Sequence, residues 1–486
     1  MPGESSTSEG PHTPPHPSLD GGRKVSGGGE GKPAAPYKQD KNRRNRGGRP
    51  KSGFPNPDFG NGGKWVARGE GAHMSPLELI EEAELRASEA TQEVLRNGWE
   101  DPTRTAPIDA MLQVIFQTRM PNPQYDEVLL GVFDRVEKLV LANLEGVTVA
   151  PFGSFASGIH SCGSDVDISL EVAPDSPFAM QLNDDPTLSN TARKRREVLY
   201  KQAKVKVLKK MFTLMRQLHY RDVQLIATAN VPLIKFVDVQ TGVHFDMCVN
   251  NTGVFKSQAL RHISTIDVRF TGLILLVKCW AKASDISDPT NGTMNSFAIT
   301  LMILFHLQQV CPPIMPPLSE ILHPDPEAAR AEVEAEDVGD AAGGSKAGPE
   351  RKGADEGAHM GVKGHHQLCI ASSQAFHATG FSSLNGHSVG ALLATFFARF
   401  AAVADLWEAG LSVRPYAGRF GKGKQWAAGK YSMIVEDPFI YSENCARSVH
   451  PSLVGKISSA FKRAAKLLET PPKDLEGAHE VVKQLF

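Results

Sequence analysis

The stretch Pro151–Glu171, PFGSFASGIHSCGSDVDISLE, decides the fold expected of this 486-residue chain. It places a Gly-Ser turn at Gly153 and Ser154, followed by the acid pair Asp165-Val-Asp167. Alternating apolar and polar residues after the second acid indicate a half-buried β-strand. Because side chains at positions i and i+2 of a strand point to the same face, the two carboxylates are expected to converge.

The neighbouring segments favour a site over a solvated turn. The apolar run Val147–Ala150 predicts a strand before the Gly-Ser turn, and Phe155–Ile159 is short enough for a helical turn whose N–H groups could meet phosphate oxygens. An Asp-X-Asp pair alone usually marks an ordinary turn, but this combination is far rarer. The pattern predicts magnesium-dependent nucleotidyl transfer, because Mg²⁺ takes oxygen ligands and bridges a triphosphate and an attacking oxygen.

A pair of metal ions needs a third carboxylate, and Asp246 is the best candidate. It lies mid-strand in His244-Phe-Asp-Met-Cys248, an apolar context where an unpaired carboxylate would be costly. Asp238 is the competitor, but it falls at the end of a predicted hairpin, where aspartate is ordinary turn chemistry.

Two lysines are candidates for binding the phosphates. Lys278 and Lys282 stand four residues apart in the otherwise apolar helical segment LILLVKCWAK, which places them on one face. That spacing suits neutralisation of the β and γ phosphates. The alternative is that both lysines simply extend to solvent at a helix end.

Composition narrows the class of protein. The chain has 53 Lys and Arg against 54 Asp and Glu, so its net charge is close to zero. Its six cysteines show neither CxxC nor zinc-ligand spacing. This favours reduced, buried thiols in an intracellular protein. Without a run of about 18 apolar residues we expect no membrane span, and no apolar signal segment opens the chain. We expect a cytoplasmic protein, with the nucleus or mitochondrion as alternatives.

Pattern and composition divide the chain into five parts. We expect a disordered basic, Gly- and Pro-rich tail over 1–74, N-terminal helices over 75–145, a catalytic α/β domain over 146–260, a helical domain over 261–323 and 368–486, and a disordered insertion over 324–367. The main helices are expected over 76–95, 108–118, 124–143, 271–282, 296–309, 388–404 and 451–468, and a hairpin over 231–249.

The stretch Arg193–Arg221 is strongly basic, and we expect it to form one helix. Its apolar residues recur every three or four positions, at Val205, Leu208, Phe212, Met215 and Leu218, which predicts one buried stripe. The opposite cationic face is either a solvated surface or a surface that steers RNA.

Five ordered segments resemble the noncanonical poly(A) polymerase and terminal uridylyltransferase family of polymerase β-like nucleotidyltransferases. They are FGSFASGIHSCGSDVDISLEV, FDMCVNN, LVKCWAK, MNSFAITLM and VEDPFIYSENCARSV, and the resemblance covers about residues 150–310 and 385–450. It implies an α+β fold in which a catalytic domain with a mixed sheet faces a mainly helical PAP-associated domain across a cleft.

The resemblance also implies roles for individual residues. Asp165, Asp167 and Asp246 would bind Mg²⁺, with Mn²⁺ as an alternative, and Asp246 would act as the base. The nucleotide would be bound by Gly153, Ser154, Ser164, Lys256, Ser257, Lys278, Lys282, Ser296, Phe297 and Asp437. Phe297 would stack on the base where the family usually has tyrosine.

The chain departs from the family pattern where the base is chosen. Lys256 replaces a usual asparagine near the ribose and uracil, Ile440 replaces an acid, and Glu443 aligns with a histidine that some members use against adenine. We expect transfer of UMP from UTP to RNA 3′ ends, with AMP transfer from ATP as the alternative. A catalytically silent RNA-binding scaffold is a more distant alternative.

RNA recognition has no obvious module of its own. The sequence shows no RRM, KH or zinc-knuckle pattern. RNA contact is therefore expected from the cleft and the basic segments, and a protein partner could supply RNA specificity.

Overall fold

The computed structural model describes residues 74–179, 189–341, 352–423, 426–427 and 429–486. The predicted disordered tail therefore lies outside the described residues, apart from Met74. Within the described ranges, no helix combines the length and the apolar character needed to cross a bilayer.

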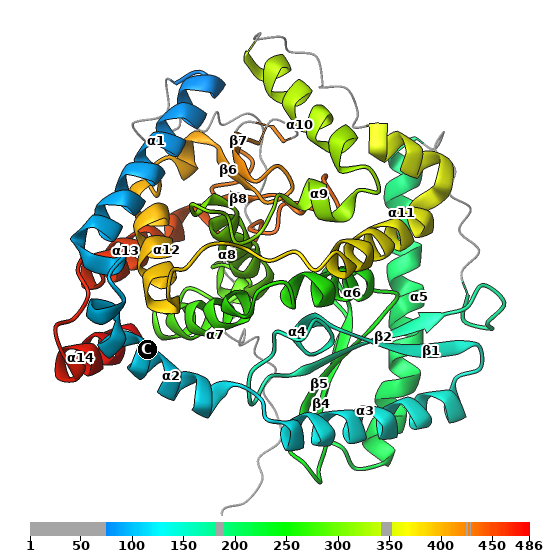
Figure 1. Cartoon of the computed structure of the whole chain (residues 1–486). Coiled ribbons are helices and arrows are strands. Elements are labelled where there is room, and N and C mark those ends of the chain that lie inside the picture. Colours follow the sequence, from blue (N-terminus) through cyan, green and yellow to red (C-terminus); the bar gives the residue numbers. More distant parts are fainter. Residues whose placement is uncertain (1–73, 180–188, 342–351, 424–425, 428) are drawn as a thin grey trace, which may run out of the picture. The chain divides into compact units, whose positions relative to one another are not determined.

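A five-stranded mixed sheet forms the centre of the α/β part (Figure 1). Its spatial order is β1-β2-β5-β4-β3, in which β2 and β5 run parallel and the other neighbours run antiparallel. The strands are β1 (Val147–Phe152), β2 (Val166–Val172), β3 (Arg221–Ile226), β4 (Leu233–Val237) and β5 (His244–Val249). The predicted strands around the acids and the predicted hairpin are confirmed, whereas β3 was not foreseen.

One face of this sheet is closed by two helices, α3 (Pro123–Asn143) and α5 (Asn190–Gln217). Ile168 and Leu170 of β2 and Phe245 of β5 are fully buried in this core. Because alternate residues of a strand point to opposite faces, Asp167 and Asp246 project from the other face. The core thus orients the acids by burying their neighbours.

The buried stripe of α5 differs from the prediction. Leu208 and Met215 are fully buried as expected, but Val207 and Met211 complete the stripe, and Leu218 is 48% exposed. The helix ends at Gln217, and the chain then turns into β3. The strand was not predicted because its first residue was assigned to the basic helix.

The helical part is built from elements before and after the sheet, and it has a small sheet of its own, ordered β7-β6-β8. Its helices are α1 (Pro76–Val94), α2 (Pro102–Arg119), α6 (Gly253–Ser264), α7 (Val268–Ala283), α8 (Ser296–Gln309), α9 (Leu318–Leu322), α12 (Val389–Ala402), α13 (Pro451–Leu467) and α14 (Leu475–Leu485). Its strands are β6 (Leu411–Arg414), β7 (Arg419–Lys422) and β8 (Ile434–Val435), with single helical turns at Leu95–Trp99, Pro289–Asn291 and Trp407–Ala409. The predicted helices agree closely with these bounds.

Two helices occupy the segment predicted to be a disordered insertion. They are α10 (Pro326–Ala341) and α11 (Lys352–Ala378), so the expectation of disorder is wrong for these residues, while 342–351 lie outside the described residues. The alanine and glutamate content that looked like low complexity also has high helix propensity. Ala329 of α10 and Cys369 of α11 are buried, which anchors both helices.

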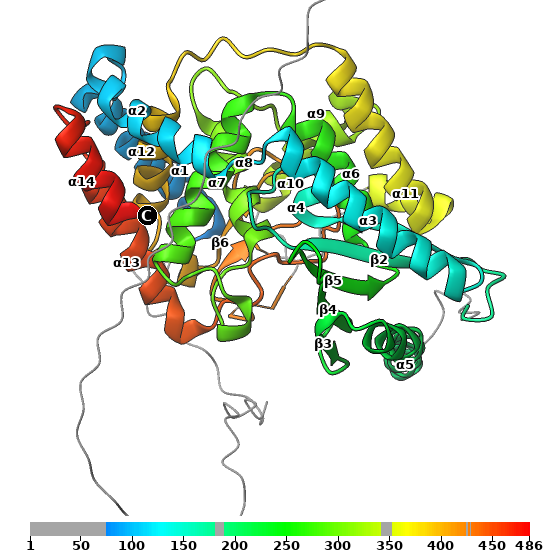
Figure 2. The same ribbon diagram turned by 90° about the horizontal axis from the view of Figure 1, so that it is seen from below.

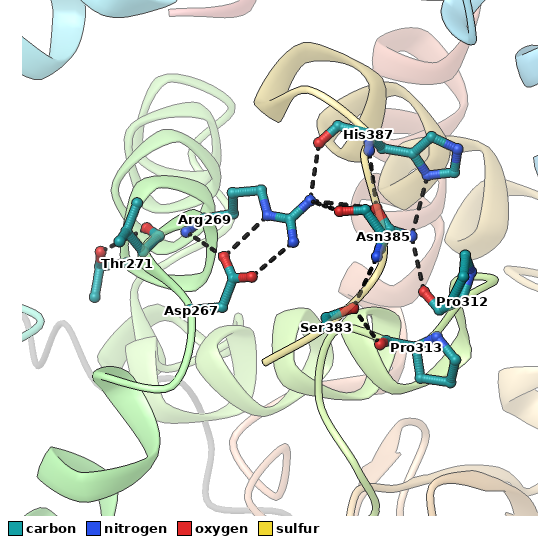
Figure 3. A network of polar contacts seen from close by, with 9 residues as sticks. Asp267, Arg269, Thr271, Pro312, Pro313, Ser383, Asn385 and His387 are labelled. Atoms are coloured by element: carbon teal, nitrogen blue, oxygen red, sulfur yellow. Dashed lines mark hydrogen bonds and ion pairs between the residues drawn. The ribbon is translucent and has the colours of Figure 1, made fainter. Parts of the chain in front are cut away.

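Arg269 ties the start of α7 to the segment before α12 (Figure 3). Its Nη1 donates to the carbonyl oxygens of Asn385 at 2.8 Å and His387 at 3.1 Å. Asn385 in turn donates to the carbonyl of Pro312 at 2.8 Å. Helix α7 bears the two candidate phosphate lysines, so this network fixes the helix that must present them.

Asp267 caps α7 and pairs with Arg269 through both carboxylate oxygens, at 2.9 and 2.6 Å. Burial pushes the pKa of Asp267 upward, but the hydrogen bonds and charge of Arg269 outweigh it and lower the pKa below its usual 3.8. A carboxyl whose folded-state pKa is depressed stabilises the protein above its unfolded pKa. That stabilisation is lost as the pH falls through the folded pKa.

Asp267→Asn should therefore lower the free energy of unfolding by about 2 kcal/mol near pH 7, because asparagine keeps the helix cap but loses the ion pair. The difference from wild type should shrink below about pH 4, as measured by thermal unfolding across pH. Asp474→Asn, at the exposed cap of α14, serves as the matched control. An equal loss at low and neutral pH would contradict the ion-pair account.

Candidate active site

The Gly-Ser turn passes directly against one of the predicted metal ligands. Gly153 opens the short helix α4 (Gly153–Ala156) with a φ of 70°, in the left-handed region that favours glycine. A Cβ on Gly153 would lie 2.0 Å from Oδ2 of Asp167. Glycine is required here because the turn and the carboxylate share the same space.

Asp167 and Asp246 are direct partners in the parallel pairing of β2 with β5. Neighbours in register on parallel strands project from the same face, so the two carboxylates lie side by side. Asp165 is exposed just before β2, and its charge acts on both other acids. The competitor Asp238 accepts hydrogen bonds from the backbone and hydroxyl of Thr241 and is part of the hairpin turn.

The three acids form a strongly negative cluster. Burial, and then the charges of Asp246 and Asp165, raise the pKa of Asp167 to about 7, against the opposing pull of Lys235 and Lys278. Burial also raises the pKa of Asp246. Among the described residues no three His, Cys, Asp or Glu side chains are already arranged to enclose a metal ion. The donor set is nevertheless one that suits a hard divalent cation, which would relieve the repulsion.

Lys235 balances part of this charge, and the sequence analysis missed it. It lies opposite Asp246 in the antiparallel pairing of β4 with β5, and its Nζ donates to both carboxylate oxygens at 2.9 and 2.6 Å. Burial lowers the pKa of Lys235, but its bonds to Asp246 more than offset this and raise it overall. The hairpin register, had it been derived from the turn, would have revealed this pair.

The two candidate phosphate lysines differ in their surroundings. Lys278 is half-buried; burial lowers its pKa to about 8, although the attraction of Asp167 opposes the change. Lys282, one turn further along α7, is exposed. The structure therefore places Lys278 near the Asp167 carboxylate and leaves Lys282 exposed in the last turn of α7.

A buried ion pair stands at the predicted base end of the site. Lys256 of α6 contacts Oδ2 of Asp437, whose side chain is 1% exposed. Oδ1 of Asp437 accepts from the backbone N–H groups of Phe439 and Ile440 at 3.0 and 3.1 Å. The Lys256 ammonium also lies 5.7 Å from the ring centroid of Phe297, so these three predicted residues are brought together.

The predicted serines fall into different settings. The Ser257 hydroxyl accepts a hydrogen bond from the backbone N–H of Gly153 at 2.8 Å, which joins α6 to the Gly-Ser turn. The Ser164 hydroxyl is held within its own turn by Ser161. Ser154 is half-buried in α4, and Ser296 is exposed in the first turn of α8. Their roles toward a nucleotide stay predictions.

The other two departures from the family pattern, Glu443 and Ile440, lie beside this ion pair. The carbonyl oxygen of Glu443 accepts from the backbone N–H of Asp437, while its carboxylate pairs with Arg447 at 3.1 Å. Ile440 is half-buried and packs against the main hydrophobic core.

Helix α11 adds two histidines that the sequence analysis did not consider. The ring of His366 stacks on Phe255 at a centroid distance of 3.6 Å, and Nε2 of His365 lies 3.2 Å from the carbonyl oxygen of Phe439. Burial, and then the charges of His365 and Lys256, lower the pKa of His366 to about 4. No local signal could have found them, because they come from the segment expected to be disordered.

Comparison with known proteins agrees with this geometry. Residues 108–265 match the family model for the central palm domain of poly(A) RNA polymerase, mitochondrial-like. Protein HESO1 of Arabidopsis thaliana is 31% identical over 383 residues, covering 77% of this chain and 64% of HESO1. Terminal uridylyltransferase 7 of Homo sapiens is 29% identical over 197 residues, or 40% of this chain and 12% of that protein. The chain thus spans less than two thirds of these relatives.

Solved structures with the same fold include mtPAP in complex with UTP, with a TM-score of 0.57 and 19% identity over 78% of this chain and 72% of that one. A cytoplasmic RNA terminal U-transferase gives a TM-score of 0.53 and 19% identity, covering 77% of this chain and 97% of that one. At such identities the likeness shows the fold, which is the predicted polymerase β-like α+β arrangement. The family model and the relatives confirm the resemblance of this chain to the noncanonical poly(A) polymerases and terminal uridylyltransferases.

Proposed function

We propose that this protein transfers a nucleoside monophosphate from a ribonucleoside triphosphate to the 3′-hydroxyl of an RNA, with release of pyrophosphate, and that UTP is its preferred donor. The observation that carries this proposal is the in-register pairing of Asp167 with Asp246, with the Gly153 backbone and the Lys278 ammonium directed to the same place. The matched relatives, named as uridylyltransferases and poly(A) RNA polymerases, support it.

The acids suit a divalent cation, and we propose Mg²⁺ with Mn²⁺ as an alternative. Asp165, Asp167 and Asp246 would hold it, since their mutual repulsion raises the pKa values of Asp167 and Asp246 and a hard cation would offset it. When bound, such an ion lowers the pKa of the attacking hydroxyl and offsets charge on the leaving oxygen.

The chain's own groups would then position the reactants. The ammonium of Lys278 would neutralise the triphosphate, and the absence of a side chain at Gly153 would let the phosphates approach the carboxylates. Asp246 would accept the proton of the RNA hydroxyl, and the hydrogen bonds and charge of Lys235 oppose the rise that burial causes in the pKa of Asp246. Positioning and charge neutralisation account for most of the rate in phosphoryl transfer.

The ion pair of Lys256 with Asp437 favours uracil as the base. The side chain of Asp437 is 1% exposed and accepts from Lys256 and two backbone N–H groups, so the group that this pair offers a base is the Lys256 ammonium, which has N–H donors to spare. The pyrimidine carbonyl oxygens of uracil accept hydrogen bonds, whereas adenine presents a donor amino group at the corresponding edge. An ammonium in this place therefore discriminates against adenine.

One observation favours ATP instead. The carboxylate of Glu443 is partly exposed beside this pair and uses one oxygen for Arg447, so the other could accept from the adenine amino group. Incubation of one short RNA with each of the four nucleotides separately decides between the two donors.

Asp165→Ala should abolish nucleotide addition, by on the order of 10³-fold or more, while leaving the fold intact because Asp165 is exposed. Mg²⁺ should raise the thermal unfolding temperature of the wild type, and this rise should be absent in the variant. Asp175→Ala, an exposed acid in the turn after β2, is the control and should keep both properties. Extension of RNA by the Asp165→Ala protein at the wild-type rate would remove the metal assignment.

Gly153→Ala should also inactivate the enzyme, because its methyl group would displace the Asp167 carboxylate. Gly163→Ala is a closely matched control, since Gly163 has a φ of 79° but no atom within 4 Å of an added Cβ. Both variants carry similar backbone strain, so a comparison of kcat at matched stability isolates the steric effect. Equal activity of the two variants would contradict it.

Lys256→Gln should reduce the preference for UTP over ATP by about 10-fold or more, the effect of one lost charge-assisted hydrogen bond. The measurement is kcat/KM for each nucleotide. The double variant Lys256→Gln/Asp437→Asn avoids a buried unpaired charge and should show the same loss if the protein folds. Arg261→Gln, an exposed cation on the same helix, is the control. An unchanged nucleotide preference in the double variant would refute the role of Lys256.

A further inference from the structure

Helix α5 has a charge imbalance that its packing does not explain. Its 28 residues contain ten Lys and Arg but one acid, Glu197. Some of these cations serve the fold: Lys204 donates to the carbonyl oxygen of Asn250 at 2.9 Å, and Lys201 donates to that of Thr228 at 3.2 Å. These bonds fasten the N-terminal half of α5 to the loops at one end of the sheet.

Six further cations project outward on the side away from the core. Successive helix residues are rotated by about 100°, which places these six within about half of the circumference, opposite the stripe of Val207, Leu208 and Met211. All six are exposed, although Lys210 also donates to the carbonyl oxygen of Asn143 at 2.9 Å. We call them the basic face of α5: Lys194, Arg195, Lys206, Lys209, Lys210 and Arg216.

The spacing of these cations is unfavourable for the helix itself. Lys209 and Lys210 stand three and four residues after Lys206, and like charges at these separations each destabilise a helix by about 0.2–0.5 kcal/mol. Within the part of the chain that the structure describes, Arg195, Lys206 and Lys209 make no ion pair with an acidic side chain. A surface of this kind gains stability when an anion with repeated charges lies along it.

The length of the basic face points to a polymer rather than a small anion. From Lys194 to Arg216 the helix rises about 33 Å, at 1.5 Å per residue, which far exceeds a single triphosphate. An RNA backbone supplies negative charges at regular intervals over such a distance.

The C-terminal end of the basic face lies at the edge of the sheet, although α5 covers the sheet face opposite the carboxylates. After Gln217 the chain turns into the edge strand β3, beginning with the exposed Arg221, and α5 packs beside this strand (Figure 2). Strand β3 lies two strands from β5, about 10 Å across the sheet. Between them, Lys235 of β4 contacts Asp246. An RNA strand on the outward side of α5 would therefore pass round the β3 edge, by Arg221 and Lys235, to reach the acids on the opposite face.

We propose that the basic face of α5 binds the phosphate backbone of the substrate RNA upstream of its 3′ end, without reading its sequence. This inference rests on the proposed function, because it assumes that an RNA 3′ end reaches the carboxylates. The face holds the body of the RNA while the terminal nucleotide reacts, so it contributes to RNA affinity and not to the chemical step.

The test is the salt dependence of RNA binding by the triple variant Arg195→Gln/Lys206→Gln/Lys209→Gln. For a single strand, the slope of log K against log salt changes by about 0.7 for each lost phosphate contact, so the slope should become shallower by about 2. Between 50 and 200 mM salt the wild type should then lose about 20-fold more affinity than the variant. Fluorescence anisotropy with an unstructured 20-nucleotide RNA measures both proteins.

The control carries the same loss of charge elsewhere. Lys462→Gln/Arg463→Gln/Lys483→Gln removes three exposed cations on α13 and α14, which pack with α12 and α2, and should keep the wild-type slope. With a four-nucleotide RNA, too short to follow α5, the α5 variant should add nucleotides at the wild-type kcat. Equal slopes for the α5 variant and wild type would overturn the proposal. Binding of an acidic protein, but not of RNA, to the basic face would also overturn it. Absence of nucleotide addition by the wild type would instead refute the proposed function, while the slope would still test RNA binding.

Discussion

The parallel pairing of β2 with β5 is the constraint on which the site depends. It places Asp167 beside Asp246, although 78 residues separate them in the chain, and a slip of one position would turn one of them to the opposite face. Parallel neighbours need a long crossover, which α5, β3 and β4 provide. The fully buried Ile168 and Phe245 hold the register, because a slip would expose them. Core packing on one face thus sets acid geometry on the other.

The site is assembled with less positive charge than its acids require. Lys235 and Lys278 both act on Asp167, yet burial and the two neighbouring carboxylates still raise its pKa to about 7. A cluster of this kind costs folding free energy, because each carboxylate is desolvated beside others of the same sign. Such a cost is expected at sites that bind cations or polyanions, where the ligand completes the charge balance.

The base end of the site shows the same dependence on contacts between distant segments. Lys256 comes from α6, Asp437 from the segment after β8, and Phe297 from α8. Helix α11 then covers α6 through the stack of His366 on Phe255. The residues predicted to face the base therefore come from three segments whose neighbours along the chain say little about them.

Local periodicity was sufficient for most of the elements. The sequence by itself determined the Gly-Ser turn, the acid-bearing strand and helices such as α7 and α8, because burial of one face leaves a pattern within a few residues. Low apolar content in contrast suggested disorder where α10 and α11 form, since anchoring residues such as Ala329 and Cys369 are few and their partners are distant. Only the tertiary structure decided that Lys256 pairs with Asp437, because helix packing brings together charges 181 residues apart and a sequence pattern carries no record of which distant charge will come within reach. The pair of Lys235 with Asp246 lies within the predicted hairpin, and it follows once the register of the two strands is known.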